Sequence, residues 1–426
     1  MPAQRARVVI AALISSACVL ASAVLAVPSQ AAAPVAADPA VITEWNVIAA
    51  RTIFTENATP IPRSGLYFGF VHIAMYDAVV AIEGGYEPYA YRAAAPPTAS
   101  AEVAAATAAY RVLRHYFPAS AGNLAVDYAA TLAGAPNGAG KVQGRLVGAR
   151  AAAEIIRLRQ NDGRDADVTL DVEPAPGVWR PTPPSFAPML GAELGFVTPL
   201  LLESATQFPL PGPDRLSTVR YARDYVEVLR YGAKERSVRT AAQTDTALFY
   251  DDNGVLQFQQ GLRDQVTRRG LDIVESSRAF ALLGTSTADA QVACWRAKYD
   301  YAYWRPITAI QLASTDGNPA TRPDADWTPL TDNPPYPEYA SGHACVTGAT
   351  TGTLSYLFGA DAIDLTVSSA VTGTTRQYET ADALDEDTMN ARIWLGIHFR
   401  KAMTDGNQLG HDVADWATTQ YFQPTG

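Results

Sequence analysis

The stretch YPEYASGHACVTGAT, from Tyr336 to Thr350, changes character at its centre. A loop rich in Pro and Tyr ends in Ser341-Gly342-His343, and small and apolar residues follow directly. This pattern predicts a loop that delivers a hydroxyl, a bare backbone amide and an imidazole to the start of a helix. The first N–H groups of a helix have no partner inside it and favour a bound anion. The stretch therefore predicts an anion site, to which the rest of the chain should bring cations.

A first pair of cations stands in CWRAKYDYAYWRP, residues 294–306. Lys298 and Arg305 are seven residues apart, so a helix would place both on one face, roughly 10 Å apart along its axis. Pro306 disfavours helical geometry at Arg305, and we expect the helix to end there. The plain alternative is a helix-end Arg and a solvated Lys. The segment is too aromatic for a solvated face, with Trp295, Tyr299, Tyr301, Tyr303 and Trp304. Two cations at a largely buried position need a buried anion.

A second pair stands in NARIWLGIHFRKAMTDG, where Arg392 and His398 lie six residues apart. We expect a strongly apolar helix from which the long Arg392 side chain reaches an anion beside His398. Taken alone, a His in an apolar helix is more often a satisfied core residue than a ligand. The Ser-Gly-His tripeptide taken alone is equally unspecific.

The composition indicates a folded globular protein, because 48% of the 426 residues are hydrophobic and only 18% are charged. Residues 1–33 resemble a secretory signal peptide, with a basic start, an apolar run and small residues at Ser29, Ala31 and Ala33 that suit cleavage. An uncleaved membrane anchor is the alternative. We expect an exported protein and no later segment apolar for long enough to span a bilayer.

Without residues 1–33, which hold two Arg and no acidic residue, 31 basic residues face 43 acidic ones, a formal charge of −12. An acidic protein is a poor candidate for binding nucleic acid or anionic lipid. Two cysteines remain, Cys294 and Cys345, and both flank the motifs above. In an exported protein they could form a disulfide, and two buried free thiols are nearly as compatible with the sequence.

Apolar periodicity predicts a mostly α protein of packed helical bundles with long Pro-rich connecting loops. We expect one helical domain over 40–426, with the motif-bearing half at about 214–426. The predicted helices are 42–56, 65–83, 98–116, 119–133, 138–160, 214–232, 236–249, 271–285, 287–304, 343–358, 377–400 and 406–421. The Pro-dense stretch 162–212 should pack on the domain through Trp179, Phe186, Phe196, Leu200 and Leu201. A second irregular stretch, 312–340, leads to Ser-Gly-His.

The three motifs in this order, Lys-x6-Arg-Pro, Ser-Gly-His and Arg-x5-His, resemble the vanadium-dependent haloperoxidases and the type 2 phosphatidic acid phosphatase superfamily to which they belong. The motifs span about 298–398, and HIAMYDAVVAI, from His72 to Ile82, is similar to an N-terminal helix of the family. The resemblance implies the helical-bundle fold of the vanadium haloperoxidases and a site for vanadate, which phosphate can also occupy.

The resemblance also implies a role for each motif residue. Lys298, Arg305 and Arg392 would neutralise the equatorial oxygens of the anion, and Ser341 and Gly342 would hydrogen-bond them. His398 would be the apical group, a ligand to vanadium or a nucleophile on phosphorus. His343 would be the acid–base residue. Trp295 and Tyr336 resemble positions that line the halide pocket.

Three positions depart from the family pattern, namely Ala340, Ala391 and Ala402, where members often have Pro, Ser and Asp. The missing Asp leaves the apical His398 without its usual orienting group. Asp405, on the same expected helical face, is the predicted substitute.

Three other candidate sites have weaker support from the sequence. We expect His72 to be a core residue bonded to Tyr76 or Asp77, FYDDNGV at 249–255 to be a turn rather than a calcium loop, and His411 to lie on a surface helix without zinc.

The leading hypothesis is a secreted vanadium-dependent haloperoxidase that oxidises halide, bromide and iodide before chloride, with hydrogen peroxide. His343 would handle protons and Lys298 would polarise the bound peroxide. The alternative is a secreted acid phosphatase that forms a phosphohistidine at His398. The chain's long helical first half and its aromatic site favour the haloperoxidase. A phosphate-binding protein without catalysis would need neither histidine. The oligomeric state is not predicted.

Overall fold

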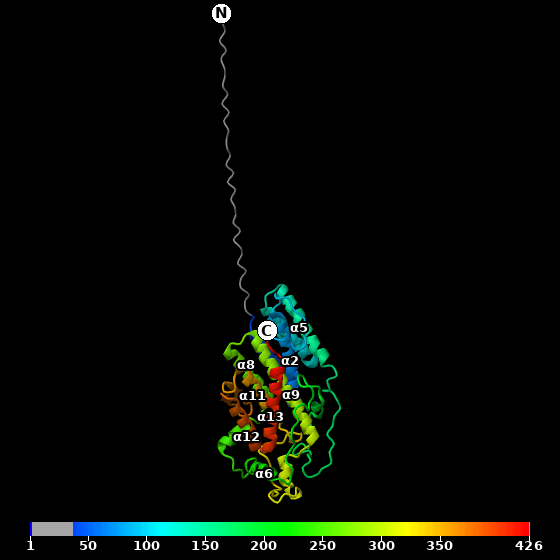
Figure 1. Cartoon of the computed structure of the whole chain (residues 1–426), viewed down its shortest axis with the longest axis vertical. Coiled ribbons are helices and arrows are strands. Elements are labelled where there is room, and N and C mark those ends of the chain that lie inside the picture. Colours follow the sequence, from blue (N-terminus) through cyan, green and yellow to red (C-terminus); the bar gives the residue numbers. More distant parts are fainter. Residues whose placement is uncertain (2–36, 426) are drawn as a thin grey trace. The chain divides into compact units, whose positions relative to one another are not determined.

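The computed structural model describes Met1 and residues 37–425, and the predicted signal peptide falls outside this range apart from Met1 (Figure 1). The chain from Ala37 onward forms one compact unit. Its α-helices are α1 (Ala40–Ala50), α2 (Ile61–Glu83), α3 (Ala101–Tyr116), α4 (Ala121–Gly134), α5 (Ala139–Leu158), α6 (Val219–Tyr231), α7 (Ala241–Phe249), α8 (Gly254–Arg269), α9 (Ile273–Tyr301), α10 (Pro306–Gln311), α11 (Gly342–Phe358), α12 (Ala381–Trp394) and α13 (Arg400–Gln420). Two short strands, β1 (Leu365–Ser368) and β2 (Thr375–Tyr378), pair antiparallel.

The long helix α9 joins two groups of helices. On one side it packs against α2, which in turn packs against α3 and α5. On the other side it packs against α11 and α13, and α12 packs against both of these helices (Figure 1). Almost the whole length of α9 is buried, from Ile273 to Lys298. The prediction of an all-α fold built from packed helical bundles is thereby confirmed.

Helix α2 is long and apolar enough to cross a membrane, with a mean hydropathy of 1.6 over its most apolar window. The expectation that no such segment follows the leader is therefore wrong by length and composition. However, 83% of that window is buried inside the fold. In the described chain α2 is a core helix, and its apolar surface is covered by protein.

The structure differs from the predicted elements at one helix break, one helix and one hairpin. The break expected near residue 286 is absent, because Thr285 and Thr287 donate their hydroxyls to carbonyls one turn back and stay inside α9. Helix α8 was not predicted, because its buried face carries Gln257, Gln259 and Gln265 and so lacks an apolar period. The short hairpin β1–β2 was also not predicted.

The Pro-rich stretch between α5 and α6 contains one short 3-10 helix, Ala192–Phe196. Three of its apolar side chains are buried as expected, Trp179, Leu200 and Leu201. Phe186, in contrast, is 64% exposed and Phe196 is 38% exposed. A buried carboxylate fixes one end of the stretch, since Asp289 of α9 accepts the backbone N–H groups of residues 200–202.

Helices α11 and α13 cross so closely that glycine is required at the contact. A Cβ built on Gly348 of α11 would clash with the backbone of Asn407, and one built on Gly410 of α13 would clash with the backbone of Cys345 and Ala349. The close crossing holds the start of α11 against α13, where the backbone N–H of Ser341 donates to the Ala402 carbonyl at 3.1 Å.

We predict that Gly348→Ala lowers the free energy of unfolding by about 1–3 kcal/mol, because the new methyl group forces two backbones apart. Gly122→Ala is the matched control, since a Cβ there meets nothing within 4 Å and helix α4 favours Ala over Gly. Urea unfolding measures both variants. Equal stabilities for the two variants would contradict this account of the crossing.

Candidate active site

The segment that carries Lys298 and Arg305 is not one helix. Helix α9 ends at Tyr301, where Ala302 adopts a left-handed conformation with φ 42°. The next residues leave the helix to pair with the Pro-rich stretch: Trp304 N donates to the Gly177 carbonyl at 3.0 Å. Pro306 starts the short helix α10 and keeps Arg305 extended. The prediction of a common helical face was wrong, although both cations still reach one site.

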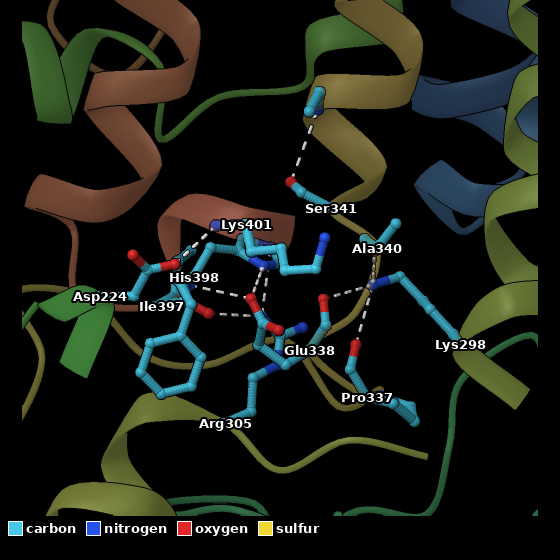
Figure 2. A network of polar contacts seen from close by, with 12 residues as sticks. Asp224, Lys298, Arg305, Pro337, Glu338, Ala340, Ser341, Ile397, His398 and Lys401 are labelled. Atoms are coloured by element: carbon cyan, nitrogen blue, oxygen red, sulfur yellow. Dashed lines mark hydrogen bonds and ion pairs between the residues drawn. The ribbon is translucent and has the colours of Figure 1, made fainter. Parts of the chain in front are cut away.

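Lys298 is fully buried, and its ammonium group lies against the loop before Ser-Gly-His. It donates to the carbonyls of Pro337, Glu338 and Ala340 at 2.8, 3.2 and 2.5 Å (Figure 2). An ammonium group has three donors, so these carbonyls occupy all of them. Lys298 therefore fixes this loop, and its charge acts on the site through space unless one carbonyl is released.

Arg305 is also fully buried, and one of its three nitrogen atoms is left without a partner among the described residues. Its Nε donates to the Tyr336 carbonyl at 2.9 Å, and Nη1 contacts the Ile397 carbonyl at 2.8 Å and His398 Nε2 at 3.2 Å. Within the described residues, Arg305 Nη2 has no partner. The guanidinium thus presents a buried, unpaired N–H beside His398 Nε2.

Arg392 and His398 come from two helices, not from one. Helix α12 ends at Trp394, Gly396 turns the chain with φ 82°, and α13 begins at Arg400. The predicted helix 377–400 was wrong here, because Gly396 abuts the carbonyl of Gly232 and leaves no room for a side chain. His398 consequently lies in the turn between α12 and α13.

Arg392 is 4% exposed at the end of α12. Its Nη1 donates to the Tyr250 carbonyl at 2.7 Å, and its Nε has no partner among the described residues. Two guanidinium groups therefore each keep a buried donor without an acceptor. Such groups cost free energy unless a ligand or water pairs with them.

The Ser-Gly-His stretch starts α11 as predicted. Ser341 is the N-cap, and its hydroxyl oxygen accepts from Ala344 N at 3.5 Å, so its O–H remains a donor. A Cβ on Gly342 would lie 3.0 Å from the Trp295 ring, a tight contact, so glycine lets the indole pack closely against the start of α11. His343 Nε2 lies 3.0 Å from the Asp252 carbonyl. A carbonyl only accepts, so Nε2 carries the proton and Nδ1 keeps the lone pair.

Trp295 and Tyr336 lie together, with ring centroids 5.0 Å apart. The Lys298 ammonium is 5.5 Å from the Trp295 ring and 4.9 Å from the Tyr336 ring, and the Arg305 guanidinium is 5.0 Å from Tyr336. The two predicted halide-pocket residues therefore form an aromatic wall next to the cations. The rings attract the cations through their negatively charged faces.

Burial disfavours charge on every group of the site. It lowers the pKa of Lys298 to about 8 and that of Arg305 to about 10. Loss of solvent, with Arg392 nearby, lowers the pKa of His343 to about 3. Burial and the neighbouring cations hold the pKa of His398 well below its usual value. Both imidazoles are thus neutral near pH 7, and a bound anion would counteract each of these shifts.

Glu338 is the site residue that the sequence analysis missed. Its carboxylate Oε1 lies 3.0 Å from His398 Nδ1 and accepts from Phe399 N at 2.9 Å. The predicted substitute, Asp405, instead accepts from the Tyr339 hydroxyl and from Lys401 Nζ. That prediction was wrong because α13 begins only after His398, so the two residues share no helical face. An acidic residue in a Pro- and Tyr-rich loop, three before Ser341, was the available signal.

The remaining candidates take structural roles. His72 is a core residue as expected, but its partner is Asn46, 2.8 Å from Nε2, and not Tyr76 or Asp77. His411 contacts Asp385 at 2.8 Å. Cys294 and Cys345 are buried free thiols. No group of three or more His, Cys, Asp or Glu in the described part of the chain could hold a metal ion.

The site is suited to an oxyanion such as vanadate. Three buried cations surround it, and two of them keep unpaired donors. His398 Nε2 lies at the same place, 3.2 Å from Arg305. A tetrahedral or trigonal-bipyramidal oxyanion needs several rigid donors of this kind. We call Lys298, Arg305, Arg392, Ser341 and Gly342 the oxyanion cage.

Comparisons with known proteins show what this chain is similar to. Residues 278–424 match the family model described as the VCPO second helical-bundle domain. Over 83 residues the chain is 34% identical to vanadium chloroperoxidase from Curvularia inaequalis, which is 17% of this chain and 13% of that protein's length.

Solved structures extend the likeness to the whole fold. A bacterial vanadium-dependent iodoperoxidase is similar with a TM-score of 0.78 and 21% identity, over 92% of this chain and 98% of that one. The holo form of a bacterial vanadium-dependent chloroperoxidase is similar with a TM-score of 0.67 and 18% identity, over 88% of this chain and 92% of that one. The apo form of a bacterial vanadium-dependent chloroperoxidase is similar with a TM-score of 0.68 and 16% identity, over 84% of this chain and 93% of that one. The resemblance to the vanadium haloperoxidases, and the fold it implies, are confirmed.

We predict that orthovanadate and orthophosphate each stabilise the protein and exclude one another, because the same unpaired donors serve both anions. An anion at 100 times its Kd should add roughly 2.7 kcal/mol to the free energy of unfolding. Thermal unfolding at several anion concentrations measures the effect.

The Arg305→Gln variant should lose most of this anion-dependent shift. Arg296→Gln is the control, because Arg296 is on the same helix as Lys298 but pairs with Asp300. Additive stabilisation by saturating amounts of both anions would show two separate sites and contradict a shared cage.

Proposed function

We propose that this protein is a vanadium-dependent haloperoxidase, which binds vanadate in the oxyanion cage and oxidises halide with hydrogen peroxide. The observation that carries the proposal is the pair of unpaired guanidinium donors beside a histidine nitrogen in a fully buried site. The likeness to the vanadium haloperoxidase fold supports it.

Each cage residue has a role that follows from its position. Arg305 and Arg392 donate their free N–H groups to the anion, and their charges offset its negative charge. Ser341 donates its O–H, and Gly342 offers the backbone N–H at the start of α11. Lys298 holds the loop and supplies a third positive charge, and releasing one carbonyl would let it polarise a bound peroxide. Vanadate, when bound, supplies the Lewis-acid centre that activates peroxide.

The two histidines, His398 and His343, have different roles. His398 would hold vanadate through Nε2, because its other nitrogen faces Glu338. His343 is neutral near pH 7 and keeps a lone pair on Nδ1, which would let it accept a proton from hydrogen peroxide and return it later. A bound anion raises its pKa toward the range in which this exchange is efficient.

The aromatic wall suggests the halide. Trp295 and Tyr336 lie over the Lys298 ammonium, so a halide drawn to this charge meets aromatic surfaces. The Tyr336 phenol makes the wall more polar than an apolar ring would. We propose that bromide and iodide, the halides that are easier to oxidise, are the substrates. We also propose that the protein is exported, on the strength of the leader at residues 1–33.

We predict that the mature protein loaded with orthovanadate oxidises iodide and bromide faster than chloride. The assay measures halogenation of an organic acceptor with peroxide, beside hydrolysis of an aryl phosphate by protein without vanadate. Strong hydrolysis with no halide oxidation at any pH would replace this proposal by the phosphatase alternative. Chloride turnover equal to bromide turnover would contradict the halide preference alone.

We predict that His398→Ala and His343→Ala differ in vanadate binding more than in activity. His398→Ala removes the apical ligand, so both affinity and turnover should collapse. His343→Ala leaves the cage and that ligand, so affinity should persist while the rate falls by roughly 10²–10⁴. Calorimetric titration of vanadate separates the two variants. Equal losses of affinity, or full activity in either variant, would contradict the assignment.

A further inference from the structure

Glu338 joins the loop before Ser-Gly-His to the turn that carries His398. Its Oε1 accepts from the backbone N–H of Phe399 at 2.9 Å and lies 3.0 Å from His398 Nδ1 (Figure 2). The side chains of His398 and Glu338 are only 2% and 1% exposed. A single oxygen atom therefore holds both the ring of His398 and the backbone of the next residue.

The neighbours of His398 determine which of its nitrogens carries the proton. Arg305 Nη1 lies 3.2 Å from Nε2, and a guanidinium group can only donate. Nε2 must then accept, so its lone pair is on the side of the cage. An imidazole that accepts at one nitrogen is the neutral form of the ring. Its one proton is consequently on Nδ1, from which it is donated to Glu338.

The rest of Glu338 is fixed as well. Its backbone carbonyl accepts from Lys298 Nζ, and the adjacent Tyr339 donates its hydroxyl to Asp405. A rotation of the His398 ring by half a turn would place a carbon atom against the Glu338 carboxylate and leave that acceptor without its donor. The contact therefore selects one ring orientation in addition to one tautomer.

A buried carboxylate is costly, which argues against a purely structural role. A neutral side chain could accept the Phe399 N–H without this cost. A carboxylate is the better partner for an imidazole that must be electron-rich at its other nitrogen.

We propose that Glu338 is a positioning residue, which fixes His398 in the Nδ1–H tautomer with the Nε2 lone pair directed into the oxyanion cage. The use of that lone pair by vanadate rests on the proposed function, but the tautomer does not. Glu338 thus takes the part for which the sequence offered Asp405.

The test uses the protein without vanadate, with ¹⁵N-labelled histidine and NMR detection of the imidazole nitrogens. The wild type should show His398 with a protonated Nδ1 and an unprotonated Nε2. In Glu338→Ala Nδ1 loses its acceptor and only the Arg305 contact still favours this tautomer, so the Nε2–H form should become detectable beside it. In Glu338→Gln the amide oxygen should stay with Phe399 N–H and keep the wild-type tautomer. Asp405→Asn is the matched control and should leave His398 unchanged.

The same variants are then titrated with orthovanadate. Glu338→Ala should bind roughly 10–100-fold more weakly than the wild type, and Glu338→Gln should recover part of this loss. A loss of general stability would not produce this order. His72 is buried, contacts Asn46 and is far from Glu338 in the sequence. Its signals in the same spectra therefore report whether each variant is folded.

An Nε2–H tautomer in the wild type, or an unchanged tautomer in a folded Glu338→Ala, would overturn the inference. If Glu338→Ala does not fold, the wild-type spectrum and the affinity of Glu338→Gln still decide. Absence of halide oxidation by the wild type would contradict the proposed function and leave the NMR result standing. The two failures are therefore distinguishable.

Discussion

Three cations removed from water are the constraint on which the site depends. Lys298 and Arg305 are fully buried and Arg392 is nearly so. Isolated buried charges are very costly, so each must be paired or solvated by dipoles. Here the dipoles are backbone carbonyls: residues 336–340 supply them to Lys298 and Arg305, Ile397 supplies a further one to Arg305, and Tyr250 supplies one to Arg392. The irregular loops are therefore ordered by the same charges that bind the anion.

The carbonyls satisfy the donors of Lys298 completely and those of the two arginines incompletely. One buried carboxylate, Glu338, opposes the three charges directly, and it is engaged with His398 and Phe399. The remaining positive charge and the unpaired N–H groups of Arg305 and Arg392 are left for a ligand. An oxyanion with two negative charges would match both needs.

The sequence predicted the members of the cage better than it predicted the elements that carry them. The order of three short motifs along the sequence was enough to select the cage residues, Lys298, Arg305, Arg392, Ser341 and Gly342. The exit from α9 at Ala302 and the break at Gly396 could not, since both depend on backbone partners far away in sequence, Gly177 and Gly232.

Helical periodicity failed where polar side chains are buried. The buried glutamines of α8 interrupt its apolar pattern, so this helix was not predicted. Thr285 and Thr287 of α9 lie where a helix end was predicted, but their hydroxyls donate to carbonyls one turn back and the helix continues. The partner of His398 was missed for a related reason. The search for an orienting acid followed the helix period beyond His398, whereas Glu338 approaches across space from a loop sixty residues earlier.

The central claim is that the unpaired guanidinium donors and His398 Nε2 share one anion. A crystal structure of the protein soaked with orthovanadate tests it most directly. The account predicts one tetrahedral or bipyramidal density, bonded to His398 Nε2 and within hydrogen-bond distance of Arg305 Nη2 and Arg392 Nε. Density at another place, or an anion held by the arginines but turned away from His398, would contradict it.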